Sequence, residues 1–345
     1  MHGPVNVGII GAGFGQQGHA PGFQATQDCE VRAMCALPLE RAQQAAKSLG
    51  IPRATDNWRE LVADPEIHAL TLAVPPSLQA EIAVAAAQAG KHLFCEKPLA
   101  LDVGQAHSIL DAARQSKIVH AMDFLFPEIA AWQKAKELLR SSAIGRIRHA
   151  ALTWRVETYA YRAQADNWKT HAATGGGTLN NFASHTFYYL EWLLGRMEKV
   201  CARLSPHDKE VEARVDAWVE FAAGFSGVVS VAADAFLGCG HRLEVYGDSG
   251  SLVLENPTTD YARGFTLSAG TRAAPRLAPV EAPGDDSHAD GRVYPVSRIA
   301  GRFIQAIRSG QTAAPNLEDG LRVQVLLDAL RRADRTGSWQ TVGAG

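Results

Sequence analysis

Long apolar segments are missing from this sequence of 345 residues. No apolar run approaches the roughly 18 residues that a membrane-spanning helix requires, so we expect no membrane as a partner. The first residues also lack a charged stretch that leads into a long apolar one, so no secretion signal is expected. Charge of one sign is equally missing, because 34 Lys and Arg accompany 36 Asp and Glu. That balance gives no reason to expect nucleic acid as a partner.

Cysteine is scarce and its spacing is irregular. The five residues are Cys29, Cys35, Cys95, Cys201 and Cys239. An odd number without a CxxC pair predicts neither a disulfide framework nor a zinc site. The 12 histidines show no spacing of the HExxH kind, so no metal is expected. These absences favour a cytoplasmic enzyme of small molecules.

Short apolar runs alternate with longer helical patterns over the first 120 residues or so. Helix-like stretches include Glu40–Leu49 and Leu78–Ala89. Apolar strands that alternate with helices predict a parallel sheet with both faces covered, here a doubly wound Rossmann domain over residues 1–125. The runs are Val5–Ile10, Val31–Cys35, Ala69–Val74, His92–Cys95 and Ile118–Met122.

The pattern changes after Pro127. A helix over Ala131–Leu139 leads into runs in which apolar and polar side chains alternate. Alternation predicts a large, open, mainly antiparallel sheet, and therefore a second α/β domain over residues 126–345. Two closing helices, Val296–Ser309 and Asp319–Arg335, could pack back on the first domain, so a boundary near residue 125 need not separate two bodies cleanly. The alternating runs are Ile147–Val156, Ala213–Phe221, Gly227–Ala233 and Arg242–Tyr246.

A glycine-rich turn follows the first strand directly. A strand, glycines and a helix N-terminus together can place backbone N–H groups against a pyrophosphate. Gly11 would allow the tight turn and Gly13 the close approach of the phosphates. Counted from Gly11, the third glycine position of GxGxxG is Gln16, where close packing of helix on strand usually requires glycine. We predict dinucleotide binding, with a plain glycine-rich turn as the alternative. The loop residues concerned are Gly11, Gly13, Phe14, Gly15 and Gln16.

The end of the second strand bears on the choice of coenzyme. An acidic residue about 20 positions after the glycines usually holds the ribose 2′-hydroxyl of NAD. Ala36 stands there, so no carboxylate would repel a 2′-phosphate. Arg41, one turn into the next helix, could pair with such a phosphate or could simply be a solvated helix residue. The sequence predicts NAD(P) as the cofactor, with NADP slightly favoured.

Glu96, Lys97 and Pro98 follow the fourth apolar run. Ligands of open α/β sheets bind outside the carboxyl ends of the strands, which is where these residues fall. A lysine there could polarise a substrate oxygen, whereas an isolated loop lysine is usually only solvated.

In this context the chain resembles the glucose–fructose oxidoreductase, inositol dehydrogenase and rhizopine-catabolism family, written Gfo/Idh/MocA. The resemblance covers nearly the whole chain. It implies a Rossmann domain, a second domain whose open sheet often forms homodimers or homotetramers, and NAD(P)-linked chemistry on sugars, cyclitols or their derivatives. It also places Lys97 between nicotinamide and substrate, and Pro75, Pro76 and Glu96 at the cofactor. The motifs are GIIGAGFG from Gly8, Ala73–Pro76, Gly90–Pro98, Ile144–Ile147, Gly175–His185, Tyr246–Leu252 and Glu318–Gln324.

The family's second signature is a glycine pair followed by D-x-x-x-H on one helix. Here Gly175–Gly177 leads to Asn181 and His185, which share a helical face at a spacing of four. The resemblance makes His185 the general base, with a structural histidine as the alternative. Asn181 stands where the family often has Asp, and an amide cannot stabilise an imidazolium as a carboxylate does. A weaker base, another substrate, a bias toward reduction or a loss of dehydrogenase activity are the possible consequences.

A loop before these glycines is rich in aromatic and hydrogen-bonding side chains. The resemblance places it over nicotinamide and sugar, where Trp168 would cover a ring and Arg162 and Lys169 would hold hydroxyls or an anion. A plain structural loop is the alternative. Tyr189, four residues after His185, could line the site, although core packing is favoured for it.

The sequence therefore predicts a dehydrogenase or reductase that transfers hydride between nicotinamide and a carbinol or ketone carbon of a sugar-like substrate. Lys97 would polarise the oxygen, and His185 beside Asn181 would move the proton. Two alternatives remain open. One is a lyase or hydrolase that uses the bound cofactor only transiently, and the other is a non-catalytic sensor that binds NAD(P).

Overall fold

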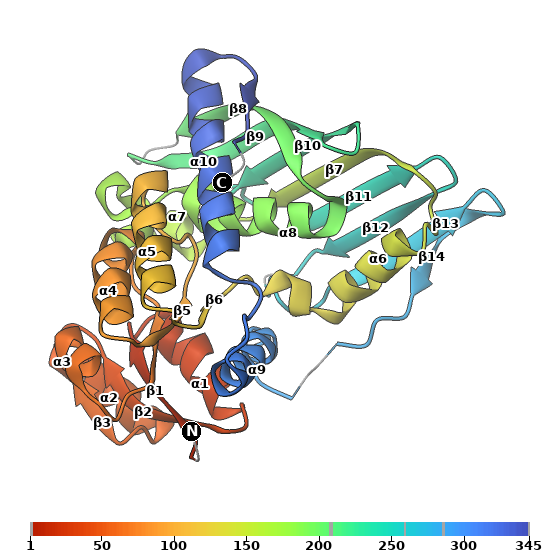
Figure 1. The fold of residues 1–345 in the computed structure, drawn as a ribbon. Coiled ribbons are helices and arrows are strands. Elements are labelled where there is room, and N and C mark those ends of the chain that lie inside the picture. Colours follow the sequence, from red (N-terminus) through yellow and green to blue (C-terminus); the bar gives the residue numbers. More distant parts are fainter. Residues whose placement is uncertain (1–2, 207–209, 259, 285–286, 344–345) are drawn as a thin grey trace. The chain divides into compact units, whose positions relative to one another are not determined.

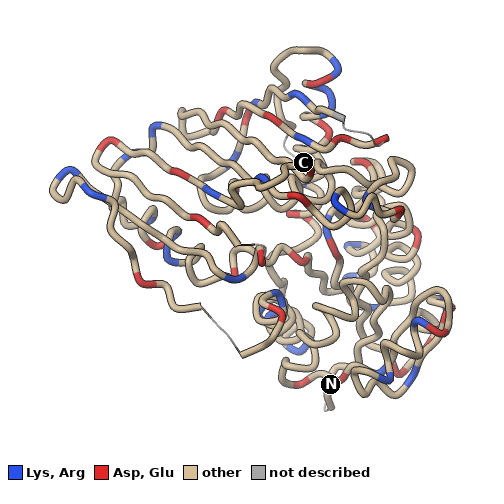
Figure 2. Tube along the Cα trace, turned by 180° about the vertical axis from the view of Figure 1, so that it is seen from behind, with Lys and Arg blue, Asp and Glu red and all other residues tan. Residues whose placement is uncertain are grey.

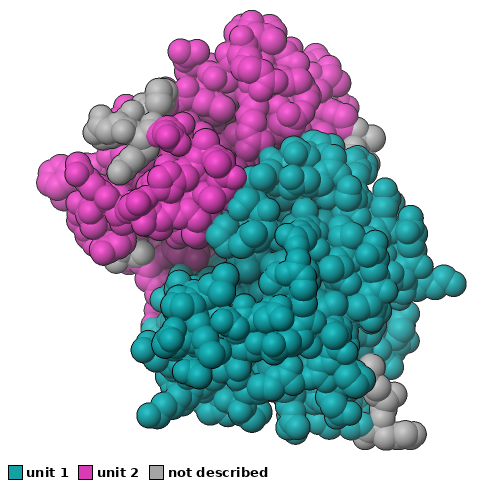
Figure 3. All heavy atoms as spheres, turned by 90° about the vertical axis from the view of Figure 1, so that its left-hand side faces the viewer, with its two compact units in different colours: residues 1–125, 287–324 teal, residues 126–286, 325–345 magenta. Residues whose placement is uncertain are grey.

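The computed structural model describes residues 3–206, 210–258, 260–284 and 287–343. The chain forms two compact units (Figure 3). Unit 1 comprises residues 1–125 and 287–324, and unit 2 comprises residues 126–286 and 325–345. The first unit therefore takes in a segment from near the end of the chain.

Unit 1 is built on a six-stranded sheet whose pairings are all parallel (Figure 1). The strand order is β3-β2-β1-β4-β5-β6, which is the doubly wound Rossmann order. The predicted fold is confirmed, but β3 was missed because its three residues carry no recognisable pattern, so the strand before Glu96 is the fifth rather than the fourth. The strands are β1 (Val5–Ile10), β2 (Cys29–Cys35), β3 (Arg53–Thr55), β4 (Ala69–Leu72), β5 (His92–Cys95) and β6 (His120–Met122).

Helices cover this sheet, and α9 from the C-terminal segment is one of them. Gly22 of α1 lets α9 approach closely, because a Cβ there would lie 2.6 Å from Cγ1 of Val296. Phe23, Phe94 and Phe303 then meet edge to face with centroids 5.1 to 6.3 Å apart, which ties α1, β5 and α9 into one core. The helices are α1 (Ala20–Gln24), α2 (Leu39–Leu49), α3 (Trp58–Ala63), α4 (Pro76–Gln88), α5 (Val103–Gln115) and α9 (Val293–Ser309), with a π-helical turn η1 (Gly15–His19) before α1.

Unit 2 holds a nine-stranded sheet in the order β14-β13-β12-β11-β7-β10-β9-β8-β15. Only the β7–β10 pairing among its named strands is parallel in the described chain, so the predicted mainly antiparallel sheet is confirmed. The strands are β7 (Ile147–Arg155), β8 (Met197–Pro206), β9 (Glu212–Phe221), β10 (Phe225–Ala232), β11 (Gly240–Gly247), β12 (Gly250–Asn256), β13 (Thr266–Thr271), β14 (Ala274–Val280) and β15 (Gln340–Thr341).

One face of this sheet is covered and the other is open. In β9, the side chains of Ala213, Val215 and Ala217 are buried, whereas those of Asp216 and Trp218 between and beyond them are exposed. Such alternation is what a half-covered antiparallel sheet requires. The covering elements include α6 (Ala130–Arg140), α8 (Ser184–Leu194) and a π-helical turn η5 (Leu179–Ala183). The other helical elements of unit 2 are a short helix α7 (Tyr159–Arg162) and 3₁₀ turns η2 (Phe126–Glu128), η3 (Trp168–Thr170) and η4 (Ala172–Thr174).

The remaining helix, α10 (Leu317–Thr336), begins in unit 1 and ends in unit 2. Within the part of the chain that is described, no helix combines the length and the apolar character that crossing a membrane would demand. Acidic and basic residues are both scattered along the trace (Figure 2).

Candidate active site

The glycine turn after β1 is shaped by close contact with the end of β4. Gly11 has a φ of +111°, and a Cβ on it would lie 2.2 Å from the carbonyl oxygen of Ala73. Only glycine meets both conditions. A Cβ on Gly13, by contrast, would meet nothing within 4 Å. A pyrophosphate can approach closely only where such a turn, between a strand and a helix, leaves open space beside it.

The helix after the turn opens as the π-helical turn η1, and this changes the role of Gln16. Gly15 is the buried residue that packs on the strand, because a Cβ there would lie 3.0 Å from Cγ2 of Ile9 and 3.3 Å from Cβ of Ala73. Gln16 is half-buried, and its Nε2 donates to Oγ of Ser48 at 3.3 Å. The expectation that Gln16 occupies the packing position is therefore wrong. The wider π turn brings the preceding residue onto the strand instead.

Phe14, between these glycines, packs beneath the helix. A Cβ on Gly18 would lie 2.4 Å from Cζ of Phe14, so Gly18 leaves room for the ring. The guanidinium of Arg292 lies 5.0 Å from the centre of the same ring. Phe14 thus holds the turn from one side through apolar and cation–π contact.

At the ribose end of the predicted cofactor site, Ala36 stands where an acid was sought, and a cation lies near the glycine turn. Ala36 is half-buried directly after β2. Arg41, in the first turn of α2, donates from Nη2 to the carbonyl oxygen of Ala12 at 3.3 Å. The guanidinium therefore lies beside the glycine turn, although Arg41 is otherwise exposed.

The turn of Glu96, Lys97 and Pro98 is held from α4. Pro75 and Pro76 begin that helix, and Gln79 lies one turn further, fully buried. Its Nε2 donates to the carbonyl oxygens of Glu96 at 2.6 Å, of Pro98 at 3.1 Å and of Leu99 at 3.0 Å. These contacts fix the backbone on either side of Lys97. Sequence reasoning missed Gln79, because nothing in its position along the helix distinguishes it.

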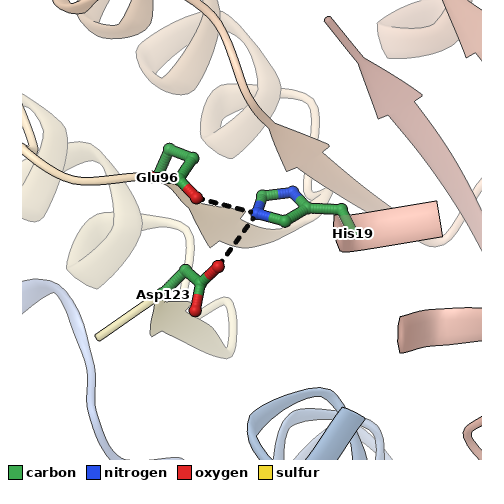
Figure 4. Close-up of side chains that lie close together, drawn as sticks. All are labelled: His19, Glu96 and Asp123. Atoms are coloured by element: carbon green, nitrogen blue, oxygen red, sulfur yellow. Dashed lines mark hydrogen bonds and ion pairs between the residues drawn. The ribbon is translucent and has the colours of Figure 1, made fainter. Parts of the chain in front are cut away.

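Glu96 also belongs to a buried cluster with His19 and Asp123 (Figure 4). Nε2 of His19 lies 3.2 Å from Oε1 of Glu96 and 3.3 Å from Oδ2 of Asp123. The side chains of His19 and Asp123 are inaccessible to solvent, and that of Glu96 is 12% exposed. His19 ends η1, and the two carboxylates directly follow the neighbouring strands β5 and β6. Adjacent parallel strands place the residues that follow them side by side, which brings these two carboxylates together.

His19 and the two carboxyl groups shift one another's pKa values. Burial lowers the pKa of His19, but hydrogen bonds and charge from Asp123 and Glu96 raise that pKa to about 9. Burial works against ionisation of Glu96, yet His19 and Lys97 bring its pKa below the ordinary value. Burial raises the pKa of Asp123 to about 6. At neutral pH the ring is therefore an imidazolium whose Nε2 faces two carboxyl groups.

In unit 2, the segment Gly175–Gly177 is clamped from three sides. A Cβ on Gly176 would lie 2.6 Å from the carbonyl oxygen of Lys169, and Gly177 has a φ of +101°. Oε1 of Glu212 accepts from the N–H of Leu179 at 2.8 Å. Asn180 also holds this segment, because its Nδ2 donates to the carbonyl oxygen of Gly175 at 3.0 Å. Sequence reasoning selected the neighbouring Asn181 and missed these two clamps.

The predicted pair Asn181 and His185 lies at the start of α8. Asn181 is half-buried within η5, and its N–H donates to the carbonyl oxygen of Gly177 at 3.0 Å. His185 follows in the first turn of α8 and is 4% exposed. Its ring meets Phe126 edge to face with centroids 5.2 Å apart. The two residues are thus carried by one continuous helical segment.

Tyr189, one turn later, faces the interior. It is inaccessible to solvent, and its hydroxyl lies 2.7 Å from Nε2 of His241 and donates to Oγ1 of Thr186 at 3.1 Å. Burial lowers the pKa of His241 to about 3, so this ring is neutral. Because the phenolic proton goes to Thr186, the Nε2–H of His241 donates to the phenolic oxygen. Tyr189 therefore serves the core of unit 2.

The three loop residues predicted to bind substrate lie near the surface. Arg162 ends α7 and is exposed, as is Lys169, whereas Trp168 is half-buried in η3. Asn167 caps this turn by accepting from the N–H of Lys169 at 3.0 Å. Nζ of Lys169 lies 5.9 Å from the Trp168 ring.

The two glycines of the turn should respond differently to alanine. Gly11→Ala is expected to lower the free energy of unfolding by at least about 2 kcal/mol, because of its positive φ and the contact with Ala73. Gly13→Ala is expected to leave that free energy within about 0.5 kcal/mol while raising the Kd of coenzyme roughly tenfold or more. Urea unfolding without coenzyme and a fluorescence titration with NADH measure the two effects. Wild-type coenzyme affinity in Gly13→Ala would refute the assignment.

Comparison with known proteins covers nearly the whole chain. Residues 5–124 match the oxidoreductase family with an NAD-binding Rossmann fold, and residues 132–253 match the GFO/IDH/MocA C-terminal domain. The uncharacterized oxidoreductase sll0816 of Synechocystis sp. is 35% identical over 356 residues, covering 98% of this chain and 96% of that protein. Levoglucosan dehydrogenase of Pseudarthrobacter phenanthrenivorans is 29% identical, covering 98% of each.

Solved structures give the same result. Levoglucosan dehydrogenase in complex with NADH aligns with a TM-score of 0.89 at 27% identity, and the alignment covers 99% of both chains. A further relative, myo-inositol 2-dehydrogenase of Thermotoga maritima, is 25% identical over 73% of this chain and 75% of its own length. With both family models matched and a relative 35% identical over almost its full length, the chain belongs to the Gfo/Idh/MocA family of NAD-binding oxidoreductases.

Proposed function

We propose that this oxidoreductase is a dehydrogenase or reductase acting on a carbinol or ketone carbon of a sugar, a cyclitol or a derivative. The observation that carries the proposal is the clamped turn of unit 1, in which Gln79 and Glu96 hold the backbone of Lys97 at the carboxyl end of β5. Relatives support the substrate class, since one was solved with NADH and levoglucosan and another is named a myo-inositol dehydrogenase.

The glycine turn fits a nicotinamide coenzyme. Gly11 makes the close turn, and Gly13 leaves open space where a phosphate would lie. When bound, the coenzyme supplies or accepts a hydride. Lys97 polarises the substrate oxygen by its positive charge, and His185 accepts the hydroxyl proton during oxidation or returns it during reduction. Asn181 orients a substrate hydroxyl through its amide. The cofactor-binding residues in this proposal are Gly11, Gly13, Phe14, Gly15, Gln16, Ala36, Arg41, Pro75, Pro76, Glu96 and Lys97.

NADP is the preferred coenzyme in this proposal. Ala36 offers no carboxylate to the ribose, and Arg41 brings a cation to the glycine turn. A guanidinium there would pair with a 2′-phosphate. Comparing kcat/KM for the two coenzymes in the wild type and in Arg41→Gln tests the preference.

Turnover with a panel of sugars, cyclitols and amino-sugar nucleotides tests the reaction type. A net change in the absorbance of reduced nicotinamide supports the dehydrogenase. Product that forms without such a change would instead show the lyase or hydrolase, in which the coenzyme is restored within each turnover. Coenzyme binding without turnover of any member of the panel would favour the sensor.

The Asn181→Asp variant tests the role of the amide. A carboxylate close to an imidazole stabilises its protonated form. The acidic limb of the pH–rate profile for oxidation is therefore expected to move to higher pH by roughly one unit or more. An unchanged profile would mean that Asn181 does not govern the proton affinity of His185.

We also propose that the chain assembles into a homodimer or homotetramer through the open face of the sheet in unit 2. Trp218 is 55% exposed and Tyr246 is 39% exposed. The strand registers place both side chains on that face. Trp218 lies in register with Val228 and Ala151, and Tyr246 lies in register with His149 and Ser226, two residues along the same strands. Exposed aromatic residues on a sheet are typical of interfaces. The molar mass in solution, measured for the wild type and for Trp218→Glu, tests this assembly.

A further inference from the structure

The proposed reaction gives no role to His19 and Asp123, which form a buried cluster with Glu96, hereafter the His19 cluster. The three residues come from separate elements, namely η1 and the ends of β5 and β6. A buried charge that lacks a partner is very costly, so the cluster can exist only because the charges meet. Its position links the glycine turn to the turn of Lys97.

Among the residues that the structure describes, two carboxyl groups act on the charge of the imidazolium. Glu96 and Asp123 are the charges that act on the ring, and Lys97 acts in turn on Glu96. The remaining contacts of the ring are apolar, since Phe14 and Phe94 meet it edge to face with centroids 5.4 and 5.1 Å away. The Nε2 proton of His19 is therefore held by two carboxyl groups and shielded from water, whereas Nδ1 is buried without a hydrogen-bond partner among the described residues.

Glu96 contacts both His19 and the backbone of Lys97. One carboxylate oxygen, Oε1, lies 3.2 Å from Nε2 of His19. The other, Oε2, accepts from the N–H of Lys97 at 3.0 Å. A rotation of the Glu96 side chain away from His19 would break the second hydrogen bond as well. The same carboxylate thus connects the end of η1 with the residue proposed to polarise the substrate.

We propose that His19 is a positioning residue of the coenzyme site: its protonated ring holds Glu96, and through Glu96 the Lys97 turn, in the conformation that binds nicotinamide coenzyme. This inference rests on the coenzyme-binding and Lys97 roles of the proposed function. Replacing a purely structural histidine would have a different result, because coenzyme affinity would then fall only as far as stability falls.

The test compares His19→Gln with a matched histidine variant on the same unit. His92, at the start of β5, is half-buried, and its Nδ1 accepts from the N–H of Val119 at 2.9 Å. His92→Gln therefore disturbs a structural hydrogen bond at the opposite end of the strand. For the full-length chain, melting temperature and the Kd for NADH and NADPH are measured by fluorescence without any substrate.

His19→Gln is expected to raise the Kd roughly ten- to a hundredfold, which is the loss of one charge-assisted hydrogen bond. His92→Gln is expected to leave the Kd within about twofold, even where it lowers the melting temperature as much. Unchanged affinity in His19→Gln, or equal losses of affinity in both variants at equal loss of stability, would overturn the proposal. Because no substrate enters this test, failure to find a sugar substrate would bear on the proposed reaction and not on His19.

The pH dependence gives a second readout. In the wild type the Kd is expected to rise as pH passes through about 9, the pKa of His19, because the ring then loses its charge. His19→Gln should lack this transition. If that variant does not fold, Asp123→Asn serves, since it removes one carboxylate that raises the pKa of His19 and so moves the transition to lower pH. An unmoved transition in Asp123→Asn would overturn the proposal.

A divalent cation is the competing occupant, because the ligand-type atoms of the His19 cluster lie within 4.8 Å of one another. EDTA is expected to leave the Kd of the wild type unchanged. A loss of affinity in EDTA that Zn²⁺ or Mn²⁺ restores would overturn the assignment of a shared proton.

Discussion

Lys97→Met is expected to lower kcat by roughly 10²- to 10⁴-fold, while the Kd of coenzyme changes by no more than a few-fold. Methionine keeps the length and the apolar stem of the side chain but loses the positive charge. That charge is the means by which the proposal stabilises the substrate oxygen as charge develops on it. The backbone that carries the side chain should stay in place, because Gln79 and Glu96 hold it through main-chain atoms. Steady-state kinetics on an identified substrate and a coenzyme titration measure the two quantities.

Lys91→Met is the matched control at the other end of the same strand. Lys91 is buried directly before β5, and its Nζ donates to the carbonyl oxygens of Asp64 at 2.5 Å and Ile67 at 2.7 Å. Removing the ammonium leaves these acceptors without their donor and costs about 1–3 kcal/mol of stability. Below its unfolding temperature, kcat should stay near that of the wild type. Near-normal kcat in Lys97→Met would remove Lys97 from the reaction.

Much of unit 1 could be read from the sequence because its strands are continuous apolar runs between clear turns. The bounds of β1 and β5 coincide with the runs Val5–Ile10 and His92–Cys95. The need for glycine at residue 11 follows from its place directly after a strand in a βαβ unit. Strands at the edges of the sheets were harder to predict from the sequence. Seven-residue β14 has two prolines and almost wholly exposed side chains, so it shows no alternation.

The internal geometry of the sites was hidden for a different reason. Both candidate segments begin with a π-helical turn, Gly15–His19 in unit 1 and Leu179–Ala183 in unit 2. A sequence pattern assumes 3.6 residues per turn, and a π turn with its i to i+5 hydrogen bonds shifts the faces that follow. That shift gave Gly15 the packing position expected for Gln16. Turns of this kind are frequent at functional sites. The π-helical turn that makes the sequence pattern misleading therefore also marks these two segments as candidate functional sites.

The His19 cluster shows what long-range pairing adds. Glu96 was selected from its motif, but Asp123 and His19 acquire meaning only when β6 lies beside β5 and η1 approaches both. A parallel, doubly wound sheet was predicted from the sequence. The distance of a side chain on η1 from two strand ends was not, because it depends on the packing of Phe14, Phe23 and Phe94 around it.

His185→Gln is expected to lower kcat by roughly 10²- to 10⁴-fold, which is the usual contribution of a general acid or base. Glutamine has a similar size and can donate and accept hydrogen bonds, but it cannot take up a proton near neutral pH. The residue stands at the start of α8, at 4% exposure and edge-on to Phe126, so its loss should also cost some stability. Catalysis and stability must therefore be separated.

His241 offers that separation, because it shares the surroundings of His185 without the proposed role. It is 2% exposed, and its ring lies 6.0 Å from that of Phe126. Burial lowers its pKa to about 3, and its Nε2 lies 2.7 Å from the hydroxyl oxygen of Tyr189. His241→Gln should thus destabilise unit 2 while the folded protein keeps its kcat. If both glutamine variants lose activity in step with stability, His185 is a core histidine and another group moves the proton.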